Sequence, residues 1–393
     1  MLVDRGYLRY DAKVEYYWPE FGKHNKNDLK LEDILRHEGG LINFLHSFQW
    51  HEFYIESIKK NIIGSVIENC KSTFPSNNLN PNGTISKRAY HGITRGLILN
   101  EIVRRVDPKG RTIGEICRED LKLEDLYCGL KDEELNRVTM LDAWSMGWVT
   151  FQSMIPYFLG SAVHVNIFDL YRLSKAKQSR AEKIGPQKPL YVDAPKAPHL
   201  IHKIMEEEEI RKVESPSANF HGNARSLGKL ACIMANKGRK INEEGRILSE
   251  DVWEQMHNDS LWALDAVLGI IFEQQHYVIP VCNIFRKNIS CLFIFFILCQ
   301  LGYRTNFTQG GINKFEDPQE PNEFEAPLIG YRNGYFGWYG MGGSVMQWDP
   351  TLKIGFGYTP TLFQWYDLQN TKAAKLQKIV SDCAKNSDIE ILN

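Results

Sequence analysis

The chain contains 393 residues with a formal net charge of −1, and it carries eight scattered cysteines. Without an excess of basic residues, its composition gives no indication of binding to nucleic acid or to an anionic membrane. Because no C-x-x-C or His/Cys metal spacing occurs, we expect free thiols in a reducing compartment and no metal or other cofactor. The expected compartment is the cytoplasm, or the mitochondrion if an N-terminal extension precedes Met1, and the oligomeric state stays open.

The N-terminal part predicts short helices separated by loops. One helix ends near His37, and residues 55–70 predict a single amphipathic helix. Its apolar side chains recur at helical spacing: Ile58, Ile62, Ile63, Val66 and Ile67. After a turn-rich loop at 77–83, residues 96–106 predict a further helix that stops at Asp107-Pro108. Its buried face is expected to hold Leu99, Ile102, Val103 and Val106. The arginines at 104 and 105 are expected to face solvent.

The middle of the chain changes character several times. Residues 143–173 are apolar and aromatic, residues 174–194 are basic and loop-like, and helices are expected at 218–237 and 248–258. Residues 272–302 differ from their surroundings because they contain an apolar run of 13 residues at 289–301. This run is too short to cross a bilayer, which needs ~20 residues. A buried strand, an interfacial segment and an inserted sequence all fit it, and we favour an insertion within a single domain spanning 1–393.

Residues 344–358 predict a β-hairpin near the end of the chain. Strands at 344–348 and 353–358 flank the turn that Asp349-Pro350 begins. Glycines just before the first strand would let the backbone come close to a ligand or to another strand. A final helix follows, capped by Asp367 or Asn370. Its apolar face is expected to contain Ala373, Leu376, Ile379, Val380 and Cys383.

The stretch from Trp338 to Ser344 resembles the last motif of the serine β-lactamase and penicillin-binding-protein superfamily. In that family the motif, K-T-G or H-x-G, edges the active site on a strand. Tyr90-His91-Gly92 is similar to the second family motif, Tyr-x-Asn, and a predicted helix follows it as in the family. The resemblance covers roughly residues 1–260 and 305–362 and is nearest to animal β-lactamase-related proteins and bacterial esterases.

Three other stretches support this resemblance. Residues 5–21 look like the family segment that ends in Y-x-P-E-F, and residues 220–227 look like the A-R-x-L-A helix start of carboxylesterase-type members. Residues 31–41 are similar to I-x-x-L-L-x-H-x-S-G-L, with Glu38-Gly39 in place of the small residue and the serine. The resemblance implies an α/β (α+β) sandwich of the β-lactamase/transpeptidase type. Such a fold has an antiparallel sheet flanked by helices and a helical subdomain, and here the N-terminal strands and the catalytic helix are expected to be missing.

The nucleophile motif of the family, S-x-x-K, should precede the segment around Tyr7, and no such motif lies there. The chemistry needs the serine hydroxyl and the lysine amine one helical turn apart, so that the proton of the attacking serine has an acceptor. Three S-x-x-K strings occur later in the chain: Ser57 with Lys60, Ser174 with Lys177, and Ser226 with Lys229. We interpret them as chance matches, and Ser226 as a helix-start or surface serine.

By resemblance, Tyr90 would be the general base, with a pKa lowered from about 10 by a neighbouring lysine; the alternative is a tyrosine packed where a loop meets a helix. His91 would border the substrate, although a histidine bonded to nearby backbone is the more frequent arrangement. Trp338 replaces the Lys or His of the motif. It is a donor only and cannot carry the positive charge that would hold a substrate carboxylate, which argues against penicillin-like or D-Ala substrates. Tyr339 would replace the motif side chain only partly. The turn that would line the substrate and offer an oxyanion N–H consists of Gly340, Gly342 and Gly343.

Three functions stay open at this point. The first is a catalytically silent family member that binds a small-molecule, peptide or ester ligand. The second is a serine hydrolase that works through an acyl-enzyme in a longer native form. The third is membrane association through residues 289–301, although we expect no membrane partner overall. Fold alone does not separate them.

Overall fold

A computed structural model describes residues 1–80, 82–155, 159–163, 167, 170, 184–194, 198–241, 244–268, 304–316, 332–367 and 370–386. The proposed insertion at 272–302 lies outside these residues, as does the S-x-x-K string at Ser174. Among the residues that are described, no helix is both long enough and apolar enough to cross a membrane.

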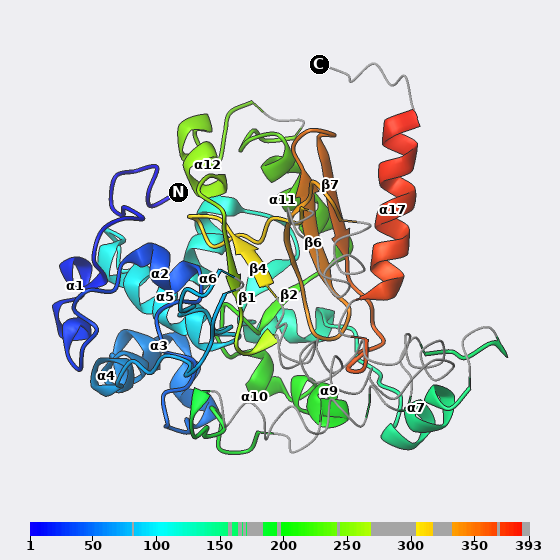
Figure 1. The fold of residues 1–393 in the computed structure, drawn as a ribbon, viewed down its shortest axis with the longest axis horizontal. Coiled ribbons are helices and arrows are strands. Elements are labelled where there is room, and N and C mark those ends of the chain that lie inside the picture. The colour runs from blue at the N-terminus through cyan, green and yellow to red at the C-terminus, as the bar shows by residue number, and fades with distance from the viewer. Residues whose placement is uncertain are drawn as a thin grey trace.

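The N-terminal half is helical and forms the blue and cyan side of the molecule (Figure 1). One cluster of buried side chains, among them Trp18, Phe21, Phe48, Phe53 and Ile98, holds this half together. Its helices are α1 (Val14–Tyr17), η1 (Pro19–Gly22), α2 (Leu31–Leu35), η2 (Trp50–Phe53), α3 (Ile55–Lys59), α4 (Ile62–Asn69), α5 (Thr94–Val106), α6 (Ile113–Ile116), η3 (Cys117–Leu121) and η4 (Asp132–Arg137).

The single helix predicted at 55–70 is wrong, because the chain breaks between α3 and α4. Asn61 adopts a left-handed conformation with φ of 64°, which an asparagine tolerates better than most residues. Its side-chain oxygen accepts hydrogen bonds from Arg104 and Arg105, both at 2.7 Å. The expectation that these two arginines face solvent is therefore also wrong. Arg105 additionally lies over the Trp18 ring, with its guanidinium carbon 3.9 Å from the ring centroid.

Helix α5 confirms the predicted helix at 96–106 and starts two residues earlier. Its face differs in part from the predicted one, since Ile102 is fully buried but Leu99, Val103 and Val106 are only half-buried. Leu97 and Ile98 are buried in their place. The reason is that α5 is covered from more than one side, by α4, α2 and α6.

All described strands pair antiparallel, in agreement with the predicted fold class. β1 (Leu126–Cys128) pairs with β2 (Phe220–Gly222), and β3 (Leu261–Leu264) pairs with β4 (Arg304–Phe307). β5 (Phe336–Tyr339), β6 (Val345–Asp349) and β7 (Ile354–Tyr358) form a three-stranded sheet. The predicted hairpin is confirmed as β6 and β7, with Trp348 opposite Gly355. The remaining helices are α7 (Met146–Ser153), η6 (Pro198–Leu200), α9 (Ile201–Met205), α10 (Glu208–Arg211), α11 (Ala224–Ala235), α12 (Glu250–His257) and α17 (Thr371–Asn386).

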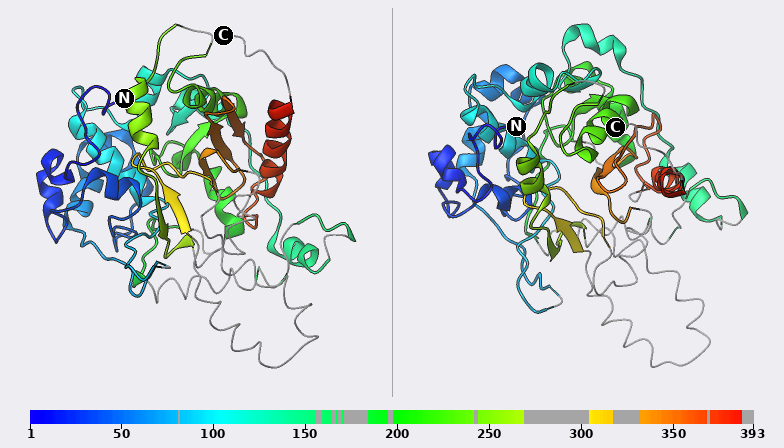
Figure 2. Two further views of the ribbon diagram at one scale, coloured as in Figure 1. Left: turned by 45° about the horizontal axis from the view of Figure 1, so that its top comes forward. Right: turned by 90° about the horizontal axis from the view of Figure 1, so that it is seen from above.

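Helix α11 packs closely against one face of the three-stranded sheet, behind β6 and β7 in Figure 1 and visible again in Figure 2. Glycines make this approach possible. A Cβ added at Gly355 would lie 2.1 Å from the Cys232 backbone nitrogen, and one at Gly357 would lie 2.4 Å from the nitrogen of Gly228. The helix predicted at 218–237 begins only at Ala224, because 220–222 pairs with β1 and Asn223 caps the helix through the Ser226 N–H. Helix α12 confirms the helix predicted at 248–258.

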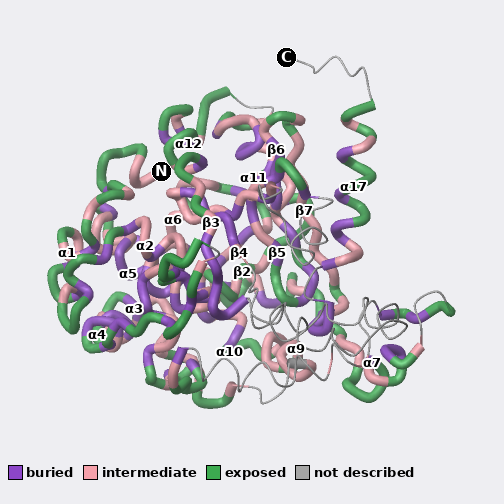
Figure 3. The backbone as a smooth tube through the Cα atoms, in the orientation of Figure 1, coloured by how far each residue is buried: buried purple, intermediate pink, exposed green. Residues whose placement is uncertain are grey.

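Helix α17 lies on the other face of the sheet, where Ala373 packs with Tyr339 and Val345. The apolar face predicted for this helix is wrong except for Ala373. Its buried residues are small or polar, namely Ala373, Ala374, Gln377 and Ser381. Leu376 and Ile379 are instead 46% and 59% exposed, and much of the α17 tube has the colour of exposed residues (Figure 3). Small side chains let the helix come close to the strands, and the Ser381 hydroxyl is 2.8 Å from the Tyr335 hydroxyl. Asp367 caps the helix as predicted, since it accepts from the Thr371 N–H at 2.8 Å.

Candidate functional site

The structure brings together Tyr90 and Trp338, the two side chains that the sequence placed in separate motifs. Tyr90 lies in the loop that leads into α5, and Trp338 lies in β5. Their rings are stacked, with centroids 5.6 Å apart and an interplanar angle of 27°. Both residues are half-buried, so part of each stays open to a ligand.

Two side chains that the sequence did not single out complete an aromatic cluster around this pair. His37 follows α2 and lies 4.7 Å from the Tyr90 ring and 5.0 Å from the Phe307 ring, centroid to centroid. Phe307, in β4, lies 5.6 Å from the Trp338 ring. The cluster therefore joins four distant parts of the chain. His37 stands in the L-L-x-H motif, which could have identified it, but nothing local distinguishes Phe307 from other core phenylalanines.

The two histidines of the site are neutral and bonded to the backbone. His91 is buried, its Nε2 accepts from the Leu41 N–H at 2.8 Å, and its Nδ1 donates to the Ala89 carbonyl at 2.6 Å. Burial lowers its pKa to about 4. Both ring nitrogens are thus used, which leaves His91 without a hydrogen-bonding group for a ligand. His37 accepts from the His91 N–H at Nδ1, at 2.9 Å. Its Nε2 therefore carries the hydrogen, and it is buried without a partner.

Asp265 fixes the backbone of the Tyr90 loop. Its Oδ1 accepts from the N–H groups of Tyr90, Val267 and Leu268 at 3.1, 2.9 and 2.9 Å. Its other oxygen, Oδ2, is buried and has no hydrogen-bond partner. Burial raises the pKa of this carboxyl, and the three N–H bonds oppose that shift. No local pattern identifies Asp265, because it lies 175 residues from Tyr90.

The electrostatics of Tyr90 differ from those expected by resemblance. Burial raises the pKa of its phenol above the ordinary value. The nearby Arg95 guanidinium opposes that rise only in part. The expectation of a lowered pKa is therefore wrong. In place of the expected lysine stands Arg95, whose Nη1 donates to the Leu35 and Gly311 carbonyls at 3.0 and 3.2 Å. A phenol with a raised pKa is a poor proton acceptor near neutral pH.

The glycine turn after β5 is used for packing. A Cβ on Gly342 would lie 2.6 Å from the Phe363 ring, and one on Gly343 would lie 2.8 Å from Pro360. The N–H groups of Gly340 and Gly343 donate within the turn, to Ser344 and Gly340 carbonyls at 2.7 and 3.2 Å. These two N–H groups are therefore not available for an oxyanion. Tyr339 is buried with its ring under Arg332, 4.8 Å from the guanidinium carbon.

Arg88 lies behind the aromatic cluster and connects it to the helical half. Its side chain is fully buried and pairs with Glu38, with Nη2 2.6 Å from Oε1. Its Nη1 donates to the carbonyls of Leu261 in β3 and Thr305 in β4, at 2.8 and 2.6 Å. Glu38 and Gly39 stand where the family pattern has a small residue and a serine. The departure has a structural reason, because Glu38 neutralises Arg88.

Comparison with known proteins identifies the family of this chain. The profile of the Beta-lactamase family matches residues 1–379. This chain belongs to the Beta-lactamase family. A family VIII carboxylesterase has the same fold, with a TM-score of 0.59 at 18% identity, covering 96% of this chain and 78% of that structure.

Other relatives of this Beta-lactamase family member include both esterases and a penicillin-binding-protein homologue. EstA from Arthrobacter nitroguajacolicus Rue61a matches with a TM-score of 0.58 at 17% identity, covering 97% of this chain and 80% of that structure. The homologue from Caulobacter crescentus matches with a TM-score of 0.55 at 23% identity, covering 96% and 78%. In sequence, the esterase/beta-lactamase LipL of Mycobacterium tuberculosis is 28% identical over 120 residues, which is 30% of this chain and 24% of that protein. The match thus spans about a quarter of this curated relative.

Neither described S-x-x-K serine is arranged like a nucleophile of this family. Ser226 is buried in the first turn of α11, where its hydroxyl donates to the Asp125 and Asn223 carbonyls at 3.0 and 2.9 Å. This confirms the interpretation as a helix-start serine, although the residue is not exposed. Ser57 lies in α3, and its Lys60 is the exposed C-cap of that helix.

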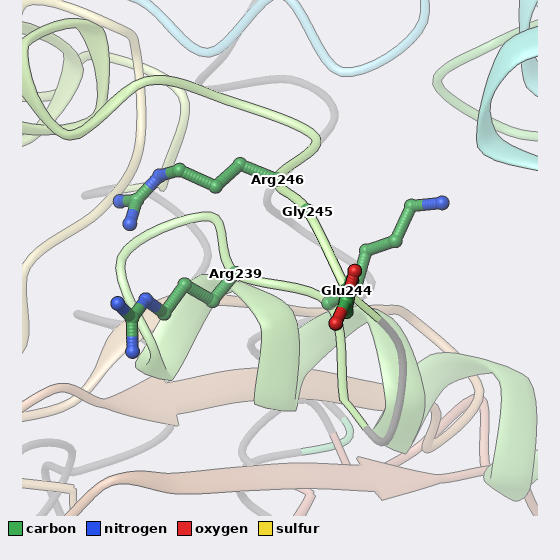
Figure 4. Close-up of a pocket in the computed structure, with 5 residues that line it drawn as sticks. Arg239, Glu244, Gly245 and Arg246 are labelled. Carbon is green, nitrogen blue, oxygen red and sulfur yellow. The ribbon is translucent and has the colours of Figure 1, made fainter.

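The described part of the chain has no group of three or more His, Cys, Asp or Glu side chains that could hold a metal ion. Figure 4 shows a cavity of about 380 Å³, lined by Arg239, Lys240, Glu244, Gly245 and Arg246. None of the predicted site residues lines it. Four of its five lining residues are charged, and all five lie in the segment between α11 and α12. This pocket is therefore distinct from the aromatic cluster, and it shares no residue with it.

Proposed function

We propose that this chain is a non-hydrolysing member of the Beta-lactamase family, which binds a small uncharged ligand at Tyr90 and Trp338. The observation that carries the proposal is the pairing of these two half-buried rings without a described serine and lysine beside them. Stacked aromatic rings offer area to a flat ligand but no nucleophile. Acyl transfer requires a nucleophile with a base to take its proton.

The ligand class follows from the charges around the rings. In the family motif a Lys or His edges the site, and Trp338 replaces that cation here. Tyr90 has a raised pKa and stays a neutral phenol. A ligand with a free carboxylate would therefore lose its hydration without gaining a cationic partner at Trp338. An apolar or aromatic ester, or an ester-like small molecule, suits the site better.

The test combines turnover, covalent labelling and binding on the full 393-residue chain. We expect no hydrolysis of p-nitrophenyl esters or of nitrocefin, and no label from a fluorophosphonate probe. Short aromatic esters should quench tryptophan fluorescence saturably, and Trp338→Leu should weaken that binding roughly tenfold, because a stacked aromatic contact contributes about 1 kcal/mol beyond its area. The matched control is Trp50→Leu, because Trp50 stacks on Tyr191 and is not part of the aromatic cluster. His91→Gln is not a suitable control, since His91 supports the Tyr90 loop.

The proposal fails if the fluorophosphonate probe phosphonylates a serine, with loss of fluoride, and peptide mapping places that serine within these residues. It also fails if esters bind the wild type and Trp338→Leu equally well. The first result would establish a hydrolase, and the second would place the ligand elsewhere.

A second function is an ester hydrolase whose S-x-x-K is supplied by sequence beyond these 393 residues. Two observations favour it over the third alternative: relatives in the comparisons are named esterases, and an apolar Trp338 suits an ester better than a carboxylate-bearing substrate. The intact mass and terminal peptides of the protein from its native source decide between the two. A larger mass with an upstream S-x-x-K peptide would favour the hydrolase, and a mass matching this chain would favour the binding protein.

A further inference from the structure

Helix α7 presents an apolar face that nothing in the described structure covers. Trp148, Phe151 and Met154 follow one another at helical spacing and are 46%, 55% and 62% exposed. Trp148 and Phe151 are in contact, with ring centroids 5.8 Å apart. The opposite face is buried, since Val149 packs with Phe363, Trp365 and Tyr366. Because this packing fixes the orientation of α7, the three side chains on its other face point outward.

The sequence around α7 is poor in charge. From residue 143 to residue 168 there is no Asp, Glu, Lys or Arg. Two more apolar side chains near α7 are exposed, Met146 at 38% and Leu159 at 66%. Contiguous apolar surface of this kind on a soluble domain indicates a contact with a partner or with lipid.

Helix α17 adds a second apolar surface with cations beside it. Leu376, Ile379 and Val380 are exposed at positions i, i+3 and i+4. The helix contains one acidic residue, Asp382, and four lysines: Lys372, Lys375, Lys378 and Lys385. Its formal net charge is therefore 4 − 1 = +3. The whole-chain charge of −1 conceals this local excess.

The two surfaces belong to the same side of the molecule. In Figures 1 and 2, α7 lies beyond the N-terminal end of α17, on the side away from α1 and α4. Lys372, in the first turn of α17, lies over the ring of Trp144, with Nζ 5.9 Å from its centroid. Trp144 immediately precedes α7 and stacks on Tyr366 at 5.8 Å. We call the exposed residues Trp148, Phe151, Met154, Leu376 and Ile379 the outer apolar surface.

We propose that the outer apolar surface docks on an anionic lipid membrane, with α7 inserted among the lipid headgroups and the lysines of α17 near them. Tryptophan, phenylalanine and methionine without neighbouring charges suit the boundary between headgroups and acyl chains. Lysines beside them are attracted to anionic headgroups. A protein partner is less well matched, because protein interfaces surround their apolar centre with a polar rim, whereas the lysines of this surface lie on α17, to one side of α7. The proposal does not depend on ligand binding at Tyr90.

The test is flotation of the full chain with vesicles of phosphatidylcholine alone or mixed with phosphatidylserine. We expect binding to the mixed vesicles, weaker binding at high salt, and weak binding to phosphatidylcholine. Trp148→Ser with Phe151→Ser should lower the partition coefficient roughly tenfold or more, since burial of each ring is lost. Lys375→Glu should lower it severalfold, and only for the anionic vesicles. Tyr16→Ser, an aromatic in α1 that is 80% exposed on the opposite side, is the matched control and should bind like the wild type.

Unchanged circular dichroism and melting temperature of the variants would establish that they are folded, as expected for exposed positions. The membrane proposal is overturned if the wild type does not float with anionic vesicles, or if the double variant floats equally well. It is also overturned if sedimentation shows a dimer that the double variant loses while vesicles bind neither protein. That last result would assign the surface to a second copy of this chain.

Discussion

At the scale of single residues, the site rests on groups that are distant in sequence and buried. Tyr90 and Trp338 were predicted because each stands in a recognisable motif. Their companions were not: Asp265 and Phe307 have no local signature, and the role of His37 depends on the fold. A raised pKa at Tyr90 was also beyond prediction, since it follows from burial, which sequence does not reveal.

Asp265 allows a sharp test of how the Tyr90 loop is held. Asp265→Ala leaves three backbone N–H groups without their acceptor, and we expect it to lower the free energy of unfolding by at least about 3 kcal/mol. Asp265→Asn keeps the accepting oxygen and resembles the neutral acid, so it should cost only about 1 kcal/mol. Urea unfolding at pH 7 measures both. Equal losses for Asn and Ala would contradict the assigned role of Oδ1.

Buried histidines predict loss of stability in mild acid. Burial lowers the pKa of His91, His221 and His257 to about 4 in the folded chain, whereas an unfolded histidine titrates near 6.5. Their contribution is therefore complete above about pH 6.5 and is lost as the pH falls toward 4, by about 1.4 kcal/mol per pH unit for each histidine.

His257 is the histidine on which to test this. It donates from Nδ1 to the Trp253 carbonyl at 2.7 Å and accepts from the Trp348 indole at 3.0 Å. Unfolding free energies at pH 7 and pH 5 give the slope, and His257→Gln should reduce the number of protons taken up on unfolding by about one. A slope identical to that of the wild type would mean that His257 is not neutral in the fold.

At the scale of elements, prediction succeeded where one face of an element packs in the expected way. The hairpin of β6 and β7, helix α12 and the cap of α17 are of this kind. It failed at Asn61, where hydrogen bonds from two arginines stabilise a break that helical periodicity does not reveal. It failed again on α17. Helical periodicity identifies the apolar face, but it does not reveal that the face with the small or polar residues Ala373, Ala374, Gln377 and Ser381 packs on the sheet.

Close packing of α11 on β7 gives the prediction at this scale. Gly355→Ala places a Cβ 2.1 Å from the Cys232 nitrogen, and since backbone is rigid there, we expect a loss of about 3 kcal/mol in the free energy of unfolding. Gly228→Ala is the matched control from the facing helix, where the nearest atom to the new Cβ is 3.9 Å away. It should be neutral or stabilising by up to about 1 kcal/mol, since alanine favours helix. Urea unfolding of the two variants side by side decides the point, and similar losses would show that the interface is looser than described.

At the scale of the whole molecule, the helical half and the strand half have separate clusters of buried side chains, one around Trp18 and others around Trp348 and Tyr339. The aromatic cluster around Tyr90 and Trp338 and several buried polar contacts connect them. Arg88 is the central one, because its guanidinium pairs with Glu38 from the helical half and donates to the carbonyls of Leu261 and Thr305 in β3 and β4. We therefore expect this side chain to contribute strongly to unfolding as the single domain expected from sequence.

Replacing Arg88 should separate the two halves. Arg88→Met preserves much of the volume but leaves the half-buried Glu38 carboxylate and two carbonyls without their partner, so we expect a loss of about 3 kcal/mol. More specifically, the wild type should unfold in one calorimetric transition, and the variant in two, since the contact that makes the halves cooperative is gone. Arg9→Ala, which removes an exposed ion pair with Asp11, should leave the single transition unchanged. Two transitions in the wild type would mean that the two halves unfold independently. A single transition in Arg88→Met would mean that other contacts, such as the bond from the Tyr90 N–H to Asp265, are sufficient to couple them.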